Sequence, residues 1–127
     1  VVYCPRAHRF YQHPPHPLPR FLKAGATAII GTDSAASNDN LALLEELRFV
    51  RDCVNAAPSA ETLLRMATLD AARALRLDDR IGSLQAGKQA DLAAFPSAAT
   101  RTDDLAPRLI DAAPAPVGVW VAGRRVV

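Results

Sequence analysis

The stretch ATAIIGTDS, residues 26–34, places an apolar run directly before a polar turn. Residues 26–30 are typical of a short buried strand, and Gly31 permits a tight turn after it. A second apolar run, Val1–Cys4, stops at a proline and predicts another strand. Between the two runs the sequence predicts a short helix that Gly25 ends. Strand, helix and strand in this order indicate a parallel α/β sheet.

Helical patterns follow this unit. Residues 43–54 repeat leucine and valine at helical spacing, with N-cap candidates at 37–40. Glu45-Glu46 is expected on the solvent side of that helix. Ser59 is predicted to cap a further helix, with an apolar face that continues to Leu75.

Other segments read as loops or strands. Residues 6–19 are rich in proline, which removes backbone donors, so a partly extended loop is expected there. A loop is also expected at 97–116, where the sequence has little pattern. The predicted strands and turns of the last third are a β segment at 81–84, a turn at 86–88, a strand at 90–95, a strand at 117–121 and a turn at 122–124.

Composition narrows the class of protein. Half of the 127 residues are hydrophobic, and 15 basic against 13 acidic residues give a net charge of +2. The charges are interspersed and form no basic face for nucleic acid. No apolar run approaches the roughly 20 residues of a membrane span, and no signal peptide is evident. We therefore expect a soluble, cytoplasmic protein with no nucleic-acid or membrane partner.

The two cysteines and the chain start add two expectations. Cys4 and Cys53 lie in no CxxC motif, so two reduced thiols are expected rather than a disulfide. The chain opens on Val1 inside an apparent strand, without an initiator methionine. We interpret it as a fragment of a longer protein.

Asp33 is the sharpest chemical signal. It directly follows an apolar strand, at the end where parallel α/β sheets carry their catalytic groups. A carboxylate there can bind a divalent metal or accept a proton from water that the metal activates. Thr32 and Ser34 can orient it through hydrogen bonds. The alternative is that Asp33 only caps the next helix.

Several other polar residues have alternative roles. His8, His13 and His16 can line a pocket, ligate a metal or simply occupy the loop, although a short proline-rich loop controls tetrahedral geometry poorly. Arg6 can pair with an anionic substrate group or with a neighbouring carboxylate. Asp91 is expected to accept backbone hydrogen bonds at a turn.

Motifs along nearly the whole chain resemble those of the amidohydrolase superfamily, in the right order. The resemblance points to its cytosine deaminase, chlorohydrolase and adenosylhomocysteine deaminase branch. The motifs are Cys4-Pro5-Arg6, Gly31-Thr32-Asp33-Ser34 with Ser37-Asn38, Met66-Ala67-Thr68, Ile81-Gly82-Ser83-Leu84 with Ala86-Gly87-Lys88, and Val119–Val127. Where many relatives read HCPRSN, this chain has Ala7 and His8 in place of the serine and asparagine.

The resemblance implies an α/β fold in two parts. Residues 1–80 would be the last strands and helices of a (β/α)8 metal-dependent hydrolase barrel, and 81–127 would be part of a small β-sandwich. Asp33 would be both metal ligand and proton acceptor, with zinc or iron as the metal. Arg6, His8 and Ser34 would face a small-molecule substrate with a C–N or similar bond.

The resemblance also implies that the other metal ligands, an HxH pair and later histidines, lie before Val1. The fragment alone would then be inactive, and it would form a homo-oligomer or associate with its missing N-terminal part. Two alternatives stay open: a non-catalytic binding or assembly protein that kept the fold, and a free-standing α/β domain in which Asp33 is only a helix cap.

Overall fold

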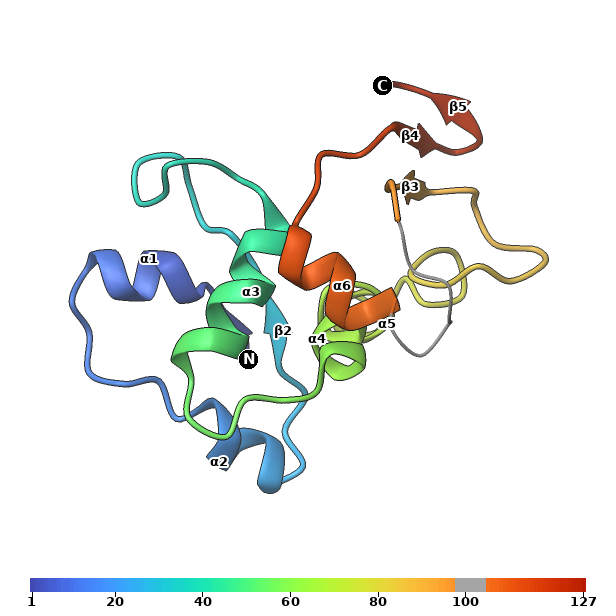
Figure 1. Cartoon of the computed structure of the whole chain (residues 1–127). Helices are drawn as coiled ribbons and strands as arrows, with labels where there is room; N and C mark the ends of the chain where they lie inside the picture. The colour runs from blue at the N-terminus through green and yellow to red at the C-terminus, as the bar shows by residue number, and fades with distance from the viewer. Residues whose placement is uncertain (98–104) are drawn as a thin grey trace.

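The structure is a computed structural model that describes residues 1–97 and 105–127 (Figure 1). It has mixed α/β architecture. The elements in chain order are β1 (Val2–Tyr3), α1 (Pro5–Phe10), α2 (Leu18–Lys23), β2 (Ile29–Ile30), α3 (Leu43–Cys53), α4 (Ala60–Met66), α5 (Leu69–Ala74), β3 (Leu92–Ala94), α6 (Leu105–Ala112), β4 (Gly118–Val121) and β5 (Arg124–Arg125). Among the described helices, none combines the length and the apolar character needed to cross a membrane.

The parallel strand pair predicted from the sequence is confirmed. β1 and β2 are parallel, with Val2 opposite Ile29 and Tyr3 opposite Ile30. The Val1 ammonium donates to the carbonyl of Thr27 at 2.8 Å. Each strand is only two residues long, shorter than the apolar runs that predicted them. A pair this short depends on the helices packed against it.

Helices α3, α4 and α6 share one hydrophobic core. α3, α4 and α5 contact β2, and α6 lies across α3 and α4 (Figure 1). Ile110 of α6 is fully buried in the same cluster as Leu47 of α3 and Leu63 of α4. Burying a side chain of this size stabilises a fold by about 1.5–3 kcal/mol. The C-terminal part of the chain therefore contributes directly to the core around β1 and β2.

The prediction of a loop over residues 6–19 is wrong at both ends of this range. α1 begins at Pro5, and α2 begins at Leu18 with Pro19 in its first turn. Proline is tolerated there because the first N–H groups of a helix have no intrahelical acceptor. α2 ends before Gly25, which has a φ of 76°, as its sequence predicted.

The single helix expected from Ser59 to Leu75 is in fact two. Ser59 does cap α4, accepting from the backbone N–H of Thr62 at 3.3 Å. The helix then breaks at Thr68, which has φ −130° and ψ −97° and separates α4 from α5. The Thr68 hydroxyl donates to the Leu64 carbonyl at 2.7 Å, replacing part of the backbone ladder. Leu75, expected on the apolar face, is exposed.

The loop expected at 97–116 is also wrong where the structure describes it. Residues 98–104 lie outside the described residues, but α6 follows directly. Pro107 stands in its first turn, where it breaks no hydrogen bond. Arg48 Nε donates to the Ile110 carbonyl at 3.0 Å, which attaches α6 to α3.

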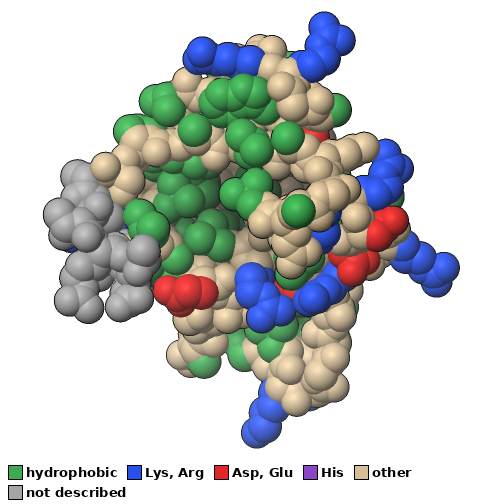
Figure 2. All heavy atoms as spheres, turned by 90° about the vertical axis from the view of Figure 1, so that its right-hand side faces the viewer, with side chains coloured by type: hydrophobic (Ala, Val, Ile, Leu, Met, Phe, Trp, Pro, Cys, Tyr) green, Lys and Arg blue, Asp and Glu red, His purple; other side chains and the backbone are tan. Residues whose placement is uncertain are grey.

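The last strands form an antiparallel sheet in the order β3-β4-β5. Asp91 accepts from the backbone N–H of Ala122 at 2.7 Å, as predicted for a turn carboxylate. The strand expected at 81–84 is absent. Figure 2 shows apolar side chains gathered around a hollow on the side of the molecule that carries this sheet. Phe95, Leu105 and Leu109 help to line a cavity of about 600 Å³ between the end of β3 and α6.

Gly82 lies in the segment 81–84, where the strand was expected. It has a φ of 87°, and a Cβ added there would lie 2.6 Å from the Cβ of Ala72 and 3.1 Å from the Cα of Leu69. Gly87 has a similar φ of 90° but nothing within 4 Å of its added Cβ. Gly82 therefore combines a left-handed backbone with a close approach to α5.

This pair provides a matched stability test. We expect Gly87→Ala to lower the free energy of unfolding by about 1–2 kcal/mol, the cost of a left-handed residue with a side chain. Gly82→Ala should cost about 1–3 kcal/mol more, because it also overpacks the contact with Ala72. Urea unfolding of both variants measures the difference. Equal losses would show that the contact with α5 is not tight.

A second prediction concerns the stacked rings of Tyr3 and His16. Their centroids lie 4.0 Å apart with 10° between the planes. Burial, and next the neighbouring His8, lower the pKa of His16 from its ordinary 6.5. The unfolded chain then binds a proton more readily than the folded one. This contribution to stability is complete above the ordinary pKa and is lost as the pH falls below it.

We expect the free energy of unfolding to decrease from about pH 7.5 to about pH 5.5. His16→Phe keeps a ring on Tyr3 and removes the titrating group, so the decrease should be smaller. His13→Phe, at an exposed position, should keep the full decrease. If the unchanged chain and both variants show the same dependence of the free energy of unfolding on pH, protonation of His16 is not coupled to unfolding.

Candidate active site

Asp33 lies in the segment that joins β2 to α3, three residues after the end of β2. Its backbone has a φ of 60°, a left-handed conformation that a residue other than glycine adopts at a cost. Its side chain is exposed. Conformations of this kind persist where the surroundings hold them and are concentrated at functional sites.

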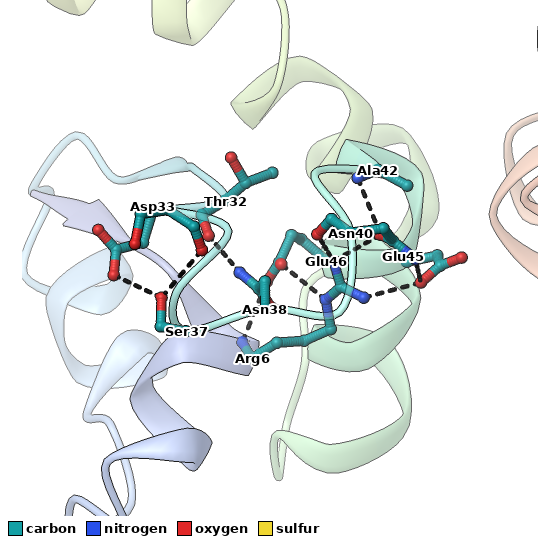
Figure 3. A network of polar contacts seen from close by, with 10 residues as sticks. Arg6, Thr32, Asp33, Ser37, Asn38, Asn40, Ala42, Glu45 and Glu46 are labelled. Atoms are coloured by element: carbon teal, nitrogen blue, oxygen red, sulfur yellow. Dashed lines mark hydrogen bonds and ion pairs between the residues drawn. The ribbon is translucent and has the colours of Figure 1, made fainter.

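Two side chains, those of Ser37 and Asn38, and the backbone of the segment fix this conformation (Figure 3). The Ser37 hydroxyl donates to Oδ2 of Asp33 at 2.8 Å, and Ser37 is only 2% exposed. The Ser37 backbone N–H donates to the Ser34 carbonyl at 3.2 Å. The Asn38 amide donates to the carbonyl of Thr32. The turn therefore closes on itself around the carboxylate.

The helix-cap alternative for Asp33 is wrong. α3 begins at Leu43, and its N-cap residue is Ala42, nine residues after Asp33 in the chain. The side chain of Ala42 makes no capping hydrogen bond, and the N-cap residue is not one of residues 37–40, where it was expected. Asn40 takes over part of that task, because its Oδ1 accepts from the Ala42 backbone N–H at 3.0 Å.

The expectation for Glu46 is wrong as well. Its side chain is fully buried in the apolar face of α3. Arg6 meets both of its oxygens: Nε donates to Oε1 at 2.7 Å and the backbone N–H donates to Oε2 at 3.0 Å. Burial of a carboxylate is tolerated because these bonds compensate for the lost water. Spacing was a signal, since Glu46 stands between Leu43 and Val50 on the apolar stripe.

The rest of the Arg6 guanidinium is also engaged. Nη1 donates to Glu45 at 2.7 Å, and Nη2 donates to the carbonyl and to Oδ1 of Asn40 at 2.8 and 2.9 Å. Of the two roles left open for Arg6, pairing with a carboxylate matches these contacts. Neither Asn40 nor Glu46 was singled out from the sequence as part of the site.

Cys4 lies beside the segment. A Cβ at Gly31 would stand 3.3 Å from its sulfur, so the two strands approach closely at this point. Burial raises the pKa of the Cys4 thiol, and a hydrogen bond from the backbone of Asp33 opposes that rise. Cys4 and Cys53 are both free thiols, as expected from their spacing.

The histidines gather elsewhere. The Nε2 of His8 lies 2.7 Å from the Pro14 carbonyl, and its ring is 5.1 Å from that of His13 and 5.5 Å from that of His16. All three line a cavity of about 890 Å³ together with Tyr3. Ser37, the partner of Asp33, lines a different cavity of about 440 Å³ next to α1.

The donor set for a metal is incomplete in the described part of the chain. The Asp33 carboxylate is the kind of hard oxygen ligand that a divalent cation takes. Within residues 1–97 and 105–127, however, no group of three or more histidine, cysteine, aspartate or glutamate side chains is placed to hold a metal ion. Asp33 fits one position of a metal site and does not make one alone.

The sequence is similar to that of a family of known proteins. The sequence profile of the amidohydrolase family matches residues 1–126. A 5-methylthioadenosine/S-adenosylhomocysteine deaminase of Moorella thermoacetica is 40% identical over 98 residues, which is 72% of this chain and 23% of the relative. An S-triazine hydrolase of Gordonia rubripertincta is 39% identical over 84 residues, or 60% of this chain and 17% of the relative.

Solved structures show the same likeness. An adenosine deaminase of Xanthomonas campestris with bound zinc superposes with a TM-score of 0.83 and 37% identity, covering 98% of this chain and 31% of the other. The aminofutalosine deaminase of Helicobacter pylori gives a TM-score of 0.81 at 28% identity, covering 99% and 32%. The chain spans less than a quarter of the length of the curated relatives above. A profile match over nearly every residue places this chain in the amidohydrolase family.

Proposed function

We propose that this chain supplies Asp33 to the active site of a metal-dependent hydrolase that cleaves C–N or similar bonds in a small molecule. The observation that carries the proposal is the exposed Asp33 carboxylate, in a left-handed conformation just after β2 and held by Ser37. Family membership supports the reaction class, since the relatives named above are deaminases and hydrolases.

Asp33 would act as one ligand of the cation and as the proton acceptor. Zinc or iron, when bound, would make a water molecule acidic enough to lose a proton near neutral pH. The Asp33 carboxylate takes that proton and returns it to the leaving group. The Ser37 hydroxyl keeps Oδ2 in a fixed direction, which limits the rotation of the carboxylate during both transfers.

The remaining ligands would come from outside these 127 residues. We propose that residues 1–80 form the last part of a (β/α)8 barrel and that β3, β4 and β5 belong to a small β-sandwich. The two-residue strands β1 and β2 would then pair with further strands of the barrel. Association with that missing part, or with further copies, follows from this architecture.

The substrate contacts follow from the same proposal. Ser34, exposed and adjacent to Asp33, is the side chain best placed to meet a substrate. Arg6 uses Nε, Nη1 and Nη2 on protein acceptors, so we assign it no substrate contact. His8 lies among the other histidines and would contribute only to a substrate that reaches their cavity. An amino group on a nucleobase-like ring fits the names of the relatives.

The main test is Asp33→Asn in the active protein that contains this chain. Asparagine keeps the size of the side chain and its bond to Ser37 but cannot accept the proton. Loss of general acid–base catalysis lowers turnover by roughly 10²–10⁴-fold, and loss of a metal ligand adds to this. We therefore expect near-complete loss of kcat, with far-UV circular dichroism unchanged.

Asp39→Asn is the matched control, because Asp39 is another exposed carboxylate of the same segment. It should leave kcat within about twofold, as most surface substitutions do. Near-normal turnover in Asp33→Asn would end the catalytic proposal and favour a binding or assembly role for the fold.

Metal binding gives a separate test on the chain alone. With a single ligand supplied by Asp33, zinc should bind only weakly, and calorimetry should show no tight site. The double variant with His13→Ala and His16→Ala should bind zinc as weakly as the unchanged chain. Submicromolar zinc binding that this double variant abolishes would assign the metal site to the histidines instead.

A further inference from the structure

We infer that Glu46 is a positioning residue: through Arg6, its buried carboxylate holds the segment 31–42 that carries Asp33. The inference rests on the proposed function for its catalytic meaning. The mechanical part rests on contacts of this chain alone, shown in Figure 3.

The first step is the burial of Glu46. Its side chain is fully buried, while that of Arg6 is 16% exposed. Arg6 Nε and the Arg6 backbone N–H each donate to one oxygen of the carboxylate, at 2.7 and 3.0 Å. One residue therefore satisfies both oxygens, and its main chain and side chain are fixed at the same time.

The second step is what Arg6 then holds. It is the second residue of α1, three positions after Tyr3, the last residue of β1. Its Nη2 reaches across to Asn40 and donates to both the carbonyl and Oδ1. Asn40 Oδ1 also accepts from Ala42, so the same atom sets the start of α3. The far end of the segment is thereby attached to the end of β1.

The third step links this attachment to Asp33. The near end of the segment is closed by Ser37 on Asp33 and by Asn38 on the Thr32 carbonyl. Asp33 has a positive φ, a conformation that persists where the surrounding structure holds it. With Asn40 released, the local bonds made by Ser37 and Asn38 would be left to oppose its relaxation.

Glu45 provides the comparison that isolates burial. It also accepts from Arg6, at 2.7 Å, and from the Asn40 amide, at 3.1 Å, but its side chain is 38% exposed. Water can replace these exposed bonds at little cost, as for most surface ion pairs. Water cannot reach Glu46 and therefore cannot replace the donors of Arg6. The buried carboxylate thus keeps the guanidinium in place.

The test is amide hydrogen exchange on the 127-residue chain, followed residue by residue by NMR, for Glu46→Gln and Glu45→Gln. In Glu46→Gln the amides of Arg6, Ser37 and Ala42 should exchange roughly 10- to 100-fold faster, the range for losing a hydrogen bond to a buried charge. In Glu45→Gln they should change by less than about threefold. The amide of Leu63 in α4, bonded to the Ser59 carbonyl at 2.9 Å, is the internal reference for global unfolding.

Faster exchange of Leu63 by the same factor would overturn the inference, because Glu46 would then stabilise the whole fold and not the segment. Unchanged exchange of Ser37 and Ala42 would overturn it equally. If Glu46→Gln does not fold, Arg6→Lys is the second variant: it keeps the positive charge but loses the planar group that reaches Glu46 and Asn40 together. It should produce the same local acceleration.

The catalytic meaning is tested separately in the active protein. Glu46→Gln should lower kcat by more than about tenfold with KM nearly unchanged, since misplacing a reacting group acts on the transition state. Glu45→Gln should leave kcat unchanged. If Asp33→Asn is inactive and Glu46→Gln is not, the positioning role is wrong. If Asp33→Asn is active, the proposed function fails, whereas the exchange result remains valid by itself.

Discussion

The buried ion pair between Glu46 and Arg6 links α3 to α1 in the N-terminal half of this chain. Glu46 lies in the apolar face of α3 and is fully buried, with Arg6 as the donor to both of its oxygens. The attraction between two buried charges is largely offset by the cost of removing both from water, so the pair determines which groups must meet more than it adds net stability. The pair fixes the distance between α1 and α3. It also fixes the segment between β2 and α3, because the same guanidinium binds Asn40.

A hydrophobic core lies beside this ion pair and stabilises the two short strands. β1 and β2 contribute two residues each, too few to form a stable sheet alone. Leu47, Leu63 and Ile110 supply the apolar surface that covers them, and Ile110 belongs to α6, more than 60 residues after α3 begins. The strand ends that carry Cys4 and Asp33 therefore depend on a helix from the far end of the sequence.

Membership of the amidohydrolase family and the geometry of the Asp33 turn rest on different observations. The profile match covers residues 1–126 and makes no use of side-chain positions. The turn geometry, in contrast, shows a carboxylate in a costly backbone conformation, exposed and held by one buried serine. The histidine cluster around His16 lines its own cavity, and within the described residues these histidines do not join Asp33 in a group that could hold a metal ion.

The sequence by itself determined the parallel strand pair, the helix that begins near residue 43, the Ser59 cap and the strand and turn at 117–124. It also singled out Asp33 as the candidate site residue. These follow from local patterns of apolar spacing, turn residues and family motifs. Tertiary structure alone decided the rest. Proline is tolerated in the first turns of α1 and α2, but burial in the shared core, at Leu18 of α2 and at Ile110 of α6, is a tertiary contact. Glu46 is buried because Arg6, 40 residues earlier, supplies donors for both oxygens, and no local pattern encodes a contact at that separation.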